Sequence, residues 1–242
     1  MIVLFTDFGL TGPYVGQMKA VLARDAAGVP VIDLFADAPA FDPMLSAYLL
    51  AAYAEWFPAG SVFLCVVDPG VGTARAPVAV QVEGRWFVGP DNGLFEPLLR
   101  RGRQVSAYRI VWQPPRLSAS FHGRDLFAPL AAQLAVVGVT NRLEAVEPAL
   151  LRRSDWPDDL PRVVYIDHYG NAMTGLRAST VAPDTVFSLN GRLVSHARTF
   201  GEVPKGNALW YENSTGPVEI AVNQGRADET LGLKPGTVLE RR

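Results

Sequence analysis

The early part of the chain alternates between strand-like and helix-like patterns, and this alternation constrains the fold more than any other feature. Apolar runs at 2–6 and 61–67 are typical of short buried strands. Helical patterns lie between them, at 14–26 and again from Asp42-Pro43, a pair that signals a helix start. Strands that alternate with helices form α/β layers, so we expect a mostly parallel sheet covered by helices.

The pattern changes after the last helical segment. Residues 151–161 are polar and contain two prolines, which is typical of a linker. Beyond them the runs are strand-like and the turns are rich in Gly and Asn. Asn190-Gly191, between two apolar runs, is a strong hairpin signal. The predicted organisation is an α/β domain at 1–150, a linker at 151–161 and a smaller all-β domain at 162–242.

Composition and charge exclude several classes of partner. The formal net charge is −2, with both signs mixed along the chain, so we expect neither nucleic-acid nor membrane binding. The single cysteine, Cys65, has no internal disulfide partner, and no Cys/His cluster has zinc spacing, so no metal site is predicted. The N-terminus lacks a signal-peptide pattern, and the apolar stretch at 44–57 is shorter than the about 20 residues that span a bilayer. We expect a cytoplasmic protein.

Polar side chains follow several of the predicted strands. Asp7 follows the first strand, Asp68 follows the run at 61–67, Asp91 follows the run at 87–90, and His122 opens a predicted helix. Ligands of open parallel sheets bind beyond the carboxyl ends of the strands, so these residues predict a site. Each has a structural alternative as a turn residue or helix cap, and for Asp91, in Pro-Asp-Asn-Gly, that alternative is favoured.

Two loops of the predicted all-β domain also carry ligand-type groups. They are Asp-His-Tyr-Gly-Asn at 167–171 and Glu-Asn-Ser-Thr-Gly at 212–216, which are either bare turns or contacts for a small polar ligand. The phosphate loop, the dinucleotide fingerprint and the Gly-x-Ser-x-Gly motif are absent. A glycine-rich phosphate cradle and an α/β-hydrolase site are therefore disfavoured.

An ordered set of motifs resembles one family. The set comprises Thr6-Asp-Phe-Gly9, Pro13-Tyr-Val-Gly16, Asp68-Pro-Gly-Val-Gly72 with Arg75, Gly89-Pro-Asp-Asn-Gly93, Phe121-His-Gly-Arg-Asp125, Asp167-His-Tyr-Gly-Asn171 and Asn213-Ser214. It resembles the S-adenosyl-L-methionine (SAM) hydroxide adenosyltransferases, or SAM hydrolases. These share a superfamily with the SAM-dependent fluorinase and chlorinase. The match runs from residue 1 to the C-terminus in one register.

The resemblance implies a reaction and an assembly. Water would attack C5′ of the SAM ribose and release adenosine and L-methionine, without a metal or a cofactor. The implied water-activating residues are Asp68, Arg75 and His122. In the halogenating relatives the aspartate and the histidine are replaced, so their presence favours water over halide. The family resemblance also implies a barrel-like C-terminal domain and a homotrimer. Each site would lie between the N-terminal domain of one subunit and the C-terminal domain of its neighbour.

The resemblance also implies substrate contacts. They are Asp7 for the ribose hydroxyls, Phe41 near the ribose, Asp167 for the methionine ammonium, Ser214 for its carboxylate, and Asn171 with the backbone at Val222 for adenine, with Glu219 nearby. The sequence leaves open whether Asp68 or His122 takes the proton from water. It also leaves open three other functions: a SAM-dependent halogenase, a metal-dependent hydrolase built on Asp7, Asp68, Asp91 and His122, and a non-catalytic protein that binds SAM or adenosine.

Overall fold

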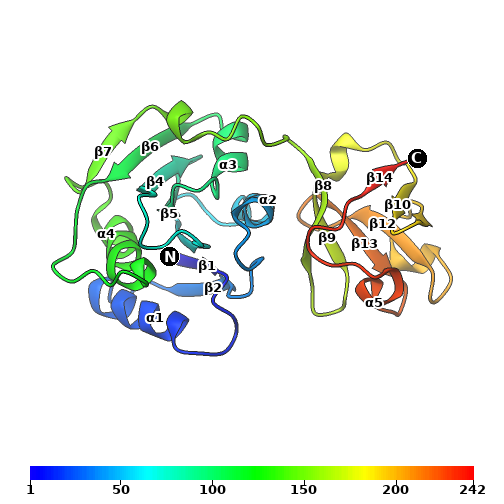
Figure 1. Ribbon diagram of the computed structural model, residues 1–242, viewed down its shortest axis with the longest axis horizontal. Coiled ribbons are helices and arrows are strands. Elements are labelled where there is room, and N and C mark those ends of the chain that lie inside the picture. The colour runs from blue at the N-terminus through cyan, green and yellow to red at the C-terminus, as the bar shows by residue number, and fades with distance from the viewer. The chain divides into compact units, whose positions relative to one another are not determined.

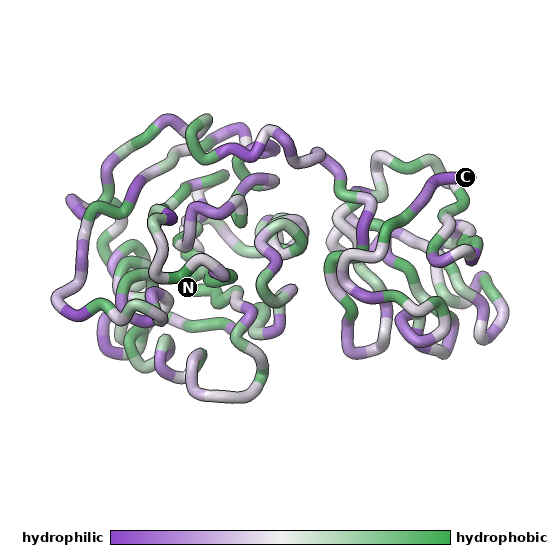
Figure 2. Tube along the Cα trace, viewed as in Figure 1, coloured by the Kyte–Doolittle hydropathy of each residue, from purple (hydrophilic) through white to green (hydrophobic).

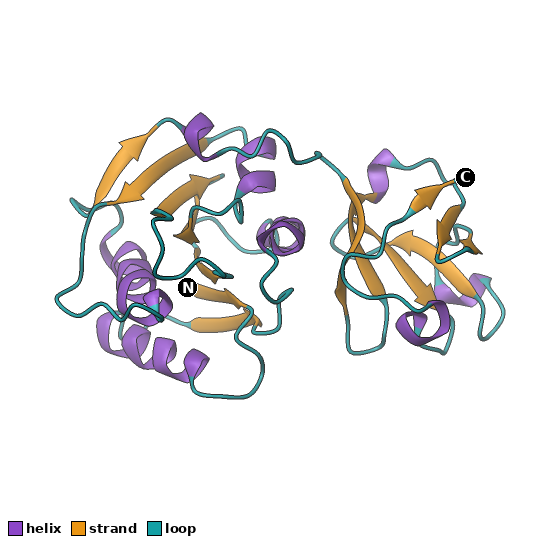
Figure 3. Ribbon diagram, in the orientation of Figure 1, coloured by secondary structure: helices purple, strands orange, loops and turns teal.

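The computed structural model describes residues 1–242. The chain divides into two compact units, Met1–Trp156 and Pro157–Arg242 (Figure 1). Helices border a sheet in the first unit, whereas strands dominate the second (Figure 3). The predicted class, an α/β domain followed by a β domain, is confirmed. No helix in either unit is long and apolar enough to cross a membrane.

The first unit contains seven strands and four α-helices. In chain order these are β1 (Ile2–Thr6), α1 (Tyr14–Asp25), β2 (Val31–Phe35), α2 (Pro43–Ala54), β3 (Val62–Val66), β4 (Pro77–Val82), β5 (Arg85–Pro90), α3 (Glu96–Arg101), β6 (Val105–Ile110), α4 (Ala128–Val137) and β7 (Leu143–Val146). The strands form one sheet in the order β2-β1-β3-β5-β4-β6-β7. The neighbours β2, β1, β3 and β5 are parallel, and β4 and β7 run against the other five.

Alternating side chains of the central strands cover both faces of this sheet. Ile2 and Leu4 of β1 pack with α1 and α4 on one face. On the other face, Phe63 of β3 stacks on Phe87 of β5 with ring centroids 4.8 Å apart. Apolar residues run along β1 and α4 in Figure 2. Apolar side chains are thus buried on both faces of the sheet. This packing holds the ends of the central strands in place.

Two predicted helix starts have different outcomes. The start at Asp42 is confirmed, because the Asp42 side chain accepts the Leu45 amide at 2.9 Å and Pro43 begins α2. The helix expected from His122 is irregular at first. Gly123–Phe127 forms a π-helical turn before α4 begins, and the His122 side chain makes no capping bond. The histidine ring is therefore available for other contacts.

The second unit consists of two antiparallel sheets. Its elements are β8 (Leu160–Ile166), β9 (Ala172–Arg177), β10 (Phe187–Leu189), β11 (Arg192–Val194), β12 (Ala208–Glu212), β13 (Pro217–Val222), α5 (Ala227–Leu231) and β14 (Glu240–Arg241). The sheet orders are β12-β13-β9-β8 and β11-β10-β14. The hairpin predicted at Asn190-Gly191 is confirmed as β10–β11. The short helix α5 departs from the expectation of strands alone.

The first part of the expected linker is packed structure. Arg152 and the Arg153 amide bind Glu96, with Nε–Oε1 at 3.0 Å and N–Oε2 at 2.5 Å, and the Glu96 side chain is only 1% exposed. Trp156 lies against Gly93, where a Cβ would approach the indole to 2.5 Å. These contacts tie 152–156 to the first unit.

Candidate active site

Asp68, Arg75 and His122 converge beyond the carboxyl end of β3. Arg75 Nε donates to Asp68 Oδ1 at 2.9 Å, and Arg75 Nη2 donates to Asp68 Oδ2. The same Nη2 lies 3.0 Å from Nδ1 of His122. The Asp68 and Arg75 side chains are 4% and 10% exposed, so this ion pair is shielded from water. The structure thus brings together the three residues predicted to activate water.

The loop geometry explains why residues so far apart in sequence meet here. Gly72 has φ +79°, and a Cβ at this position would lie 2.5 Å from the Ala119 carbonyl oxygen. Only glycine allows the loop after β3 to pack this closely on the segment before His122. Asn92 Nδ2 donates to the Val67 carbonyl at 2.8 Å and holds the chain just after β3.

The contact with Arg75 assigns the hydrogen-bond roles of the His122 ring. A guanidinium only donates, so Nδ1 of His122 must accept, and the proton of the neutral ring is on Nε2. Burial lowers the pKa of His122 from its ordinary value, and the positive charge of Arg75 lowers it further. The neutral ring therefore presents an N–H donor at Nε2.

A hollow of about 180 Å³ adjoins this cluster in the first unit. It is lined by Asp7, Phe8, Phe41, Val66, Asp68, Val71, Ser120, Phe121, His122 and Gly123. β1 and β3 are parallel neighbours with Thr6 paired to Val66, so Asp7 and Asp68 follow the same ends of adjacent strands. Burial raises the pKa of Asp7, whose Oδ2 accepts the Phe41 amide at 3.0 Å. Phe41 has φ +60° and a 79% exposed side chain.

Asp91 lies outside this hollow. Its Oδ1 binds Arg153 Nη2 at 3.0 Å, so this side chain has a structural partner that its turn sequence does not predict. Nowhere in the chain do three His, Cys, Asp or Glu side chains converge as ligands for one ion. Of the four residues named for the metal-dependent alternative, Asp7, Asp68 and His122 line the hollow, whereas Asp91 does not.

The predicted contacts of the second unit gather around the β8–β9 turn. Asp167 accepts from the Asn171 amide at 2.8 Å and from Asn171 Nδ2 at 3.2 Å. Glu219 of β13 is close enough for the charge of Asp167 to contribute to its raised pKa, although burial is the larger cause. Val222 lies at the end of β13 and is buried. Carboxylate and amide groups thus concentrate at one end of this sheet.

Ser214 is linked to that end through Glu219. Tyr211 donates to Glu219 Oε2, and Asn213 Nδ2 donates to the same oxygen at 2.7 Å. Asn213 Oδ1 accepts the Thr215 amide at 2.8 Å, which shapes the turn that presents the exposed Ser214. Ser214 opens into a separate hollow beside His196. The second unit therefore presents its predicted ligand groups on two adjoining surfaces.

Family models match both units. A model described as the SAM hydroxide adenosyltransferase N-terminal domain matches residues 2–144, and one described as the C-terminal domain of the same family matches 161–240. The chain belongs to the SAM hydroxide adenosyltransferase family. The resemblance inferred from the motifs is thereby confirmed.

Individual relatives of the family cover nearly the whole chain. An (R)-S-adenosyl-L-methionine hydrolase of Thermus thermophilus is 41% identical over 97% of this chain and 96% of the relative. A protein of the same name from Salinispora arenicola is 38% identical over 97% and 94%. A fluorinase of Actinopolyspora mzabensis is 24% identical over 98% and 95%. A solved structure of an uncharacterized conserved protein from Thermotoga maritima has a TM-score of 0.87 and 29% identity over the full length of both chains.

Sequence reasoning missed one arginine beside the predicted ligand loop of this family member. Arg226 Nη1 donates to the His168 carbonyl at 2.9 Å, and its Nη2 binds Asp228 Oδ2 at 2.8 Å. The Asp228 amide donates to the Gly170 carbonyl at 3.0 Å. Gly170 has φ +84°, and a Cβ there would lie 2.5 Å from Asp228 Oδ1. The glycine in Asp-His-Tyr-Gly-Asn was the one available signal that the backbone is closely approached here.

Proposed function

We propose that this chain hydrolyses SAM to adenosine and L-methionine through attack of water on ribose C5′. The observation that carries the proposal is the shielded Asp68–Arg75 pair in contact with His122, beside a hollow that is also lined by Asp7. The Thermus thermophilus and Salinispora arenicola relatives are both named hydrolases of (R)-S-adenosyl-L-methionine. We therefore propose the (R) configuration at sulfur for the substrate of this chain.

The hydrogen-bond roles in the cluster support Asp68 as the proton acceptor. Arg75 has no lone pair to offer, and Nδ1 of His122 already accepts from Arg75. Nε2 of the neutral ring carries a proton, so it can donate to the oxygen of the attacking water and orient it. Of the three residues, the Asp68 carboxylate alone retains lone pairs for a proton. His122 then positions the water, and Arg75 holds the other two side chains in place.

The step balances without a further reactant. The water oxygen forms a bond to C5′ while the C5′–S bond breaks, and the bonding pair stays on sulfur, which leaves as the neutral thioether of methionine. The water proton passes to Asp68. The positive charge on sulfur already activates the carbon, so the step needs a positioned water, a base and exclusion of bulk solvent. We propose that it proceeds without a metal or cofactor.

The remaining substrate contacts are part of the proposal. The lining of the hollow supports Asp7 and Phe41 as ribose contacts. The proposed contacts of the second unit are Asp167 with the ammonium, Ser214 with the carboxylate, and Asn171 and the Val222 backbone with adenine, with Glu219 nearby. Ligand-type groups in both units support a homotrimer in which neighbouring subunits share each site. We also retain the cytoplasmic location as an expectation.

Product analysis tests the function directly. Purified protein treated with a chelator is incubated with a mixture of the two sulfonium epimers, and products are identified by mass spectrometry while NMR follows each epimer. We expect adenosine and methionine from the (R) epimer. A 5′-halogenated adenosine as the main product in chloride or fluoride buffer would favour the halogenase alternative. Activity that disappears on chelation would favour a metal-dependent hydrolase, and adenosine binding without turnover would favour a sensor.

A further inference from the structure

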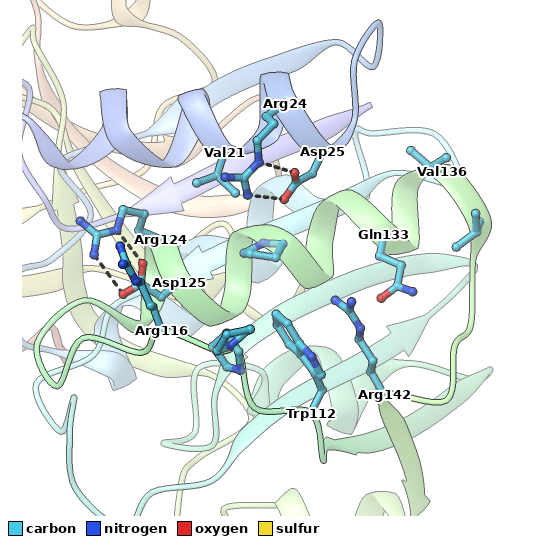
Figure 4. Close-up of a pocket in the computed structure, with 14 residues that line it drawn as sticks. Val21, Arg24, Asp25, Trp112, Arg116, Arg124, Asp125, Gln133, Val136 and Arg142 are labelled. Carbon is cyan, nitrogen blue, oxygen red and sulfur yellow. Dashed lines mark hydrogen bonds and ion pairs between the residues drawn. The ribbon is translucent and has the colours of Figure 1, made fainter.

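A second hollow in the first unit, of about 870 Å³, lies outside the candidate active site. One face of α4 forms its floor, where Pro129, Gln133 and Val136 recur at helical spacing. The C-terminal part of α1, with Arg24, lies along one side, and Trp112 lies along the other (Figure 4). Val136 is 57% exposed, so part of the floor is apolar and open to a ligand.

The lining carries an excess of positive charge. It contains four arginines and two aspartates, and two of the arginines form ion pairs at 2.6 Å with the aspartate that follows each in sequence. The other two, Arg116 and Arg142, take part in neither of these ion pairs, although the charge of Arg142 is close enough to Asp25 to contribute to the lowered pKa of that carboxyl. The lining therefore carries two more positive than negative charges beside a partly apolar floor, and this combination attracts an anion.

Arg142 is held in a geometry suited to binding an anion. Its guanidinium carbon lies over the Trp112 ring, 3.9 Å from the ring centroid, and this cation–π contact holds the group in place. A guanidinium presented edge-on can donate two parallel hydrogen bonds to a carboxylate or a phosphate.

Gln133 adds a polar group that the fold does not use. Its side chain extends from α4 toward the space beside Arg142 (Figure 4). Its amide oxygen is buried and has no hydrogen-bond partner. A buried acceptor without a donor is unfavourable, so a ligand with an N–H or O–H next to its anionic group would gain a partner here.

We propose that this groove binds a small organic anion, with its carboxylate or phosphate on Arg142 and its apolar body on Trp112 and Pro129. Gln133 accepts a hydrogen bond from the ligand, and Arg116 contributes to the attraction. The site is separate from the Asp68 cluster, and the proposal does not depend on the reaction catalysed there.

Titration of the full chain with two aryl anions tests the proposal. Phenyl phosphate and benzoate share a ring and differ in the anionic group, and benzamide is the neutral control. The Gln133 side-chain amide and the Trp112 indole are followed by ¹⁵N NMR, with Gln133→Leu and Trp112→Phe to assign the signals. We expect saturable shifts of both signals with at least one anion, at a dissociation constant of about 1 mM or tighter, and none with benzamide. The anion that binds identifies phosphate or carboxylate as the natural group.

Matched variants locate the binding. Arg142→Ala should weaken it about tenfold or more, because a charge-assisted bidentate contact is lost. Arg109→Ala removes an exposed arginine of β6 that lies outside the groove, and affinity should not change. The proposal is wrong if neither anion gives saturable shifts or if Arg142→Ala binds as tightly as the wild type. Inorganic phosphate binding as tightly as phenyl phosphate would also overturn it, because the apolar body would then contribute nothing.

Discussion

Each unit contains an aspartate–arginine pair beside a predicted substrate loop, and the two pairs differ in exposure. The Asp68 and Arg75 side chains are 4% and 10% exposed, whereas those of Asp228 and Arg226 are 20% and 41% exposed. Both pairs use two guanidinium nitrogens on one carboxylate. The same type of aspartate–arginine contact is therefore shielded from solvent in the first unit and exposed at the surface in the second.

The pairs also differ in what else they touch. Arg75 reaches the ring of His122, a side chain of the proposed reaction, whereas Arg226 reaches the carbonyl of His168, a main-chain group. Water screens an exposed pair and competes with it, so the pair contributes little on its own. The comparison supports the role proposed for Arg75 beside the reacting atoms, whereas Arg226 contacts only the main chain of a loop.

The largest effect is expected from Arg75→Lys. Lysine keeps the charge but lacks the planar fork that contacts Asp68 and His122 together. We expect kcat to fall about hundredfold, close to the loss in Arg75→Ala, with little change in adenosine affinity. Turnover assays and calorimetry on both variants measure this. Wild-type turnover in Arg75→Lys would show that Arg75 acts only as a positive charge and would remove the contrast with Arg226.

A smaller effect is expected from acid. Burial and the charge of Arg75 lower the pKa of His122, so the ring is neutral at pH 7 and Nδ1 can accept from Arg75. Protonation of the His122 ring would place an N–H at Nδ1, directed at the N–H of Arg75 Nη2. We expect kcat to be constant near neutrality and to fall about tenfold per pH unit once the pH is below the His122 pKa, itself below about 6.5. The stability that the neutral ring contributes is present above that ordinary value and is lost as the pH falls.

The pH profile of kcat needs one control. Burial raises the pKa of Asp7, so this carboxylate can also titrate in acid. Asp7→Asn removes that titration and should leave the acid midpoint of kcat in place, with a higher KM because the ribose contact is weaker. An acid midpoint above 6.5 would contradict the neutral ring assigned to His122.

The smallest effect is expected from Arg226→Ala. The loop 167–171 would lose one external hydrogen bond, so we expect KM for SAM to rise about fivefold with kcat unchanged. Arg192→Ala, an exposed arginine of β11 in the same unit, is the matched control and should leave KM unchanged. A fall in kcat as large as that of Arg75→Lys would erase the distinction between the two pairs.

Crowding at Gly170 offers an independent check on the same loop. Gly170 and Gly236 both have positive φ, at +84° and +90°, but only Gly170 has neighbours within 3 Å of an added Cβ. Gly170→Ala should therefore raise KM as Arg226→Ala does, whereas Gly236→Ala should affect stability alone. Equal KM values in the two glycine variants would mean that Asp228 and Arg226 do not position the loop.

Much of this architecture is readable from local sequence. Asp68 stands out because it follows a buried run, His122 because it opens a predicted helix beside a glycine, and Asp42-Pro43 marks a helix start that the structure contains. The role of Asp91 depends on a contact with Arg153. Arg153 is far away in the chain, so no local sequence pattern predicts this contact. The protonated nitrogen of His122 depends on which nitrogen faces Arg75, and only coordinates show that. Local rules thus predict elements and candidate residues, whereas long-range contacts decide their chemistry.

The packing of Glu96 has a consequence for anyone who divides this chain into fragments or builds chimeras. A cut at residue 150, where the sequence alone suggests a boundary, would remove Arg152 and the Arg153 amide from Glu96. The carboxylate would keep only Arg100, in a site where it is 1% exposed. It would also remove Trp156 from Gly93 and uncover the surface between them. A fragment that ends after Trp156 keeps its buried charge balanced, so junctions belong there.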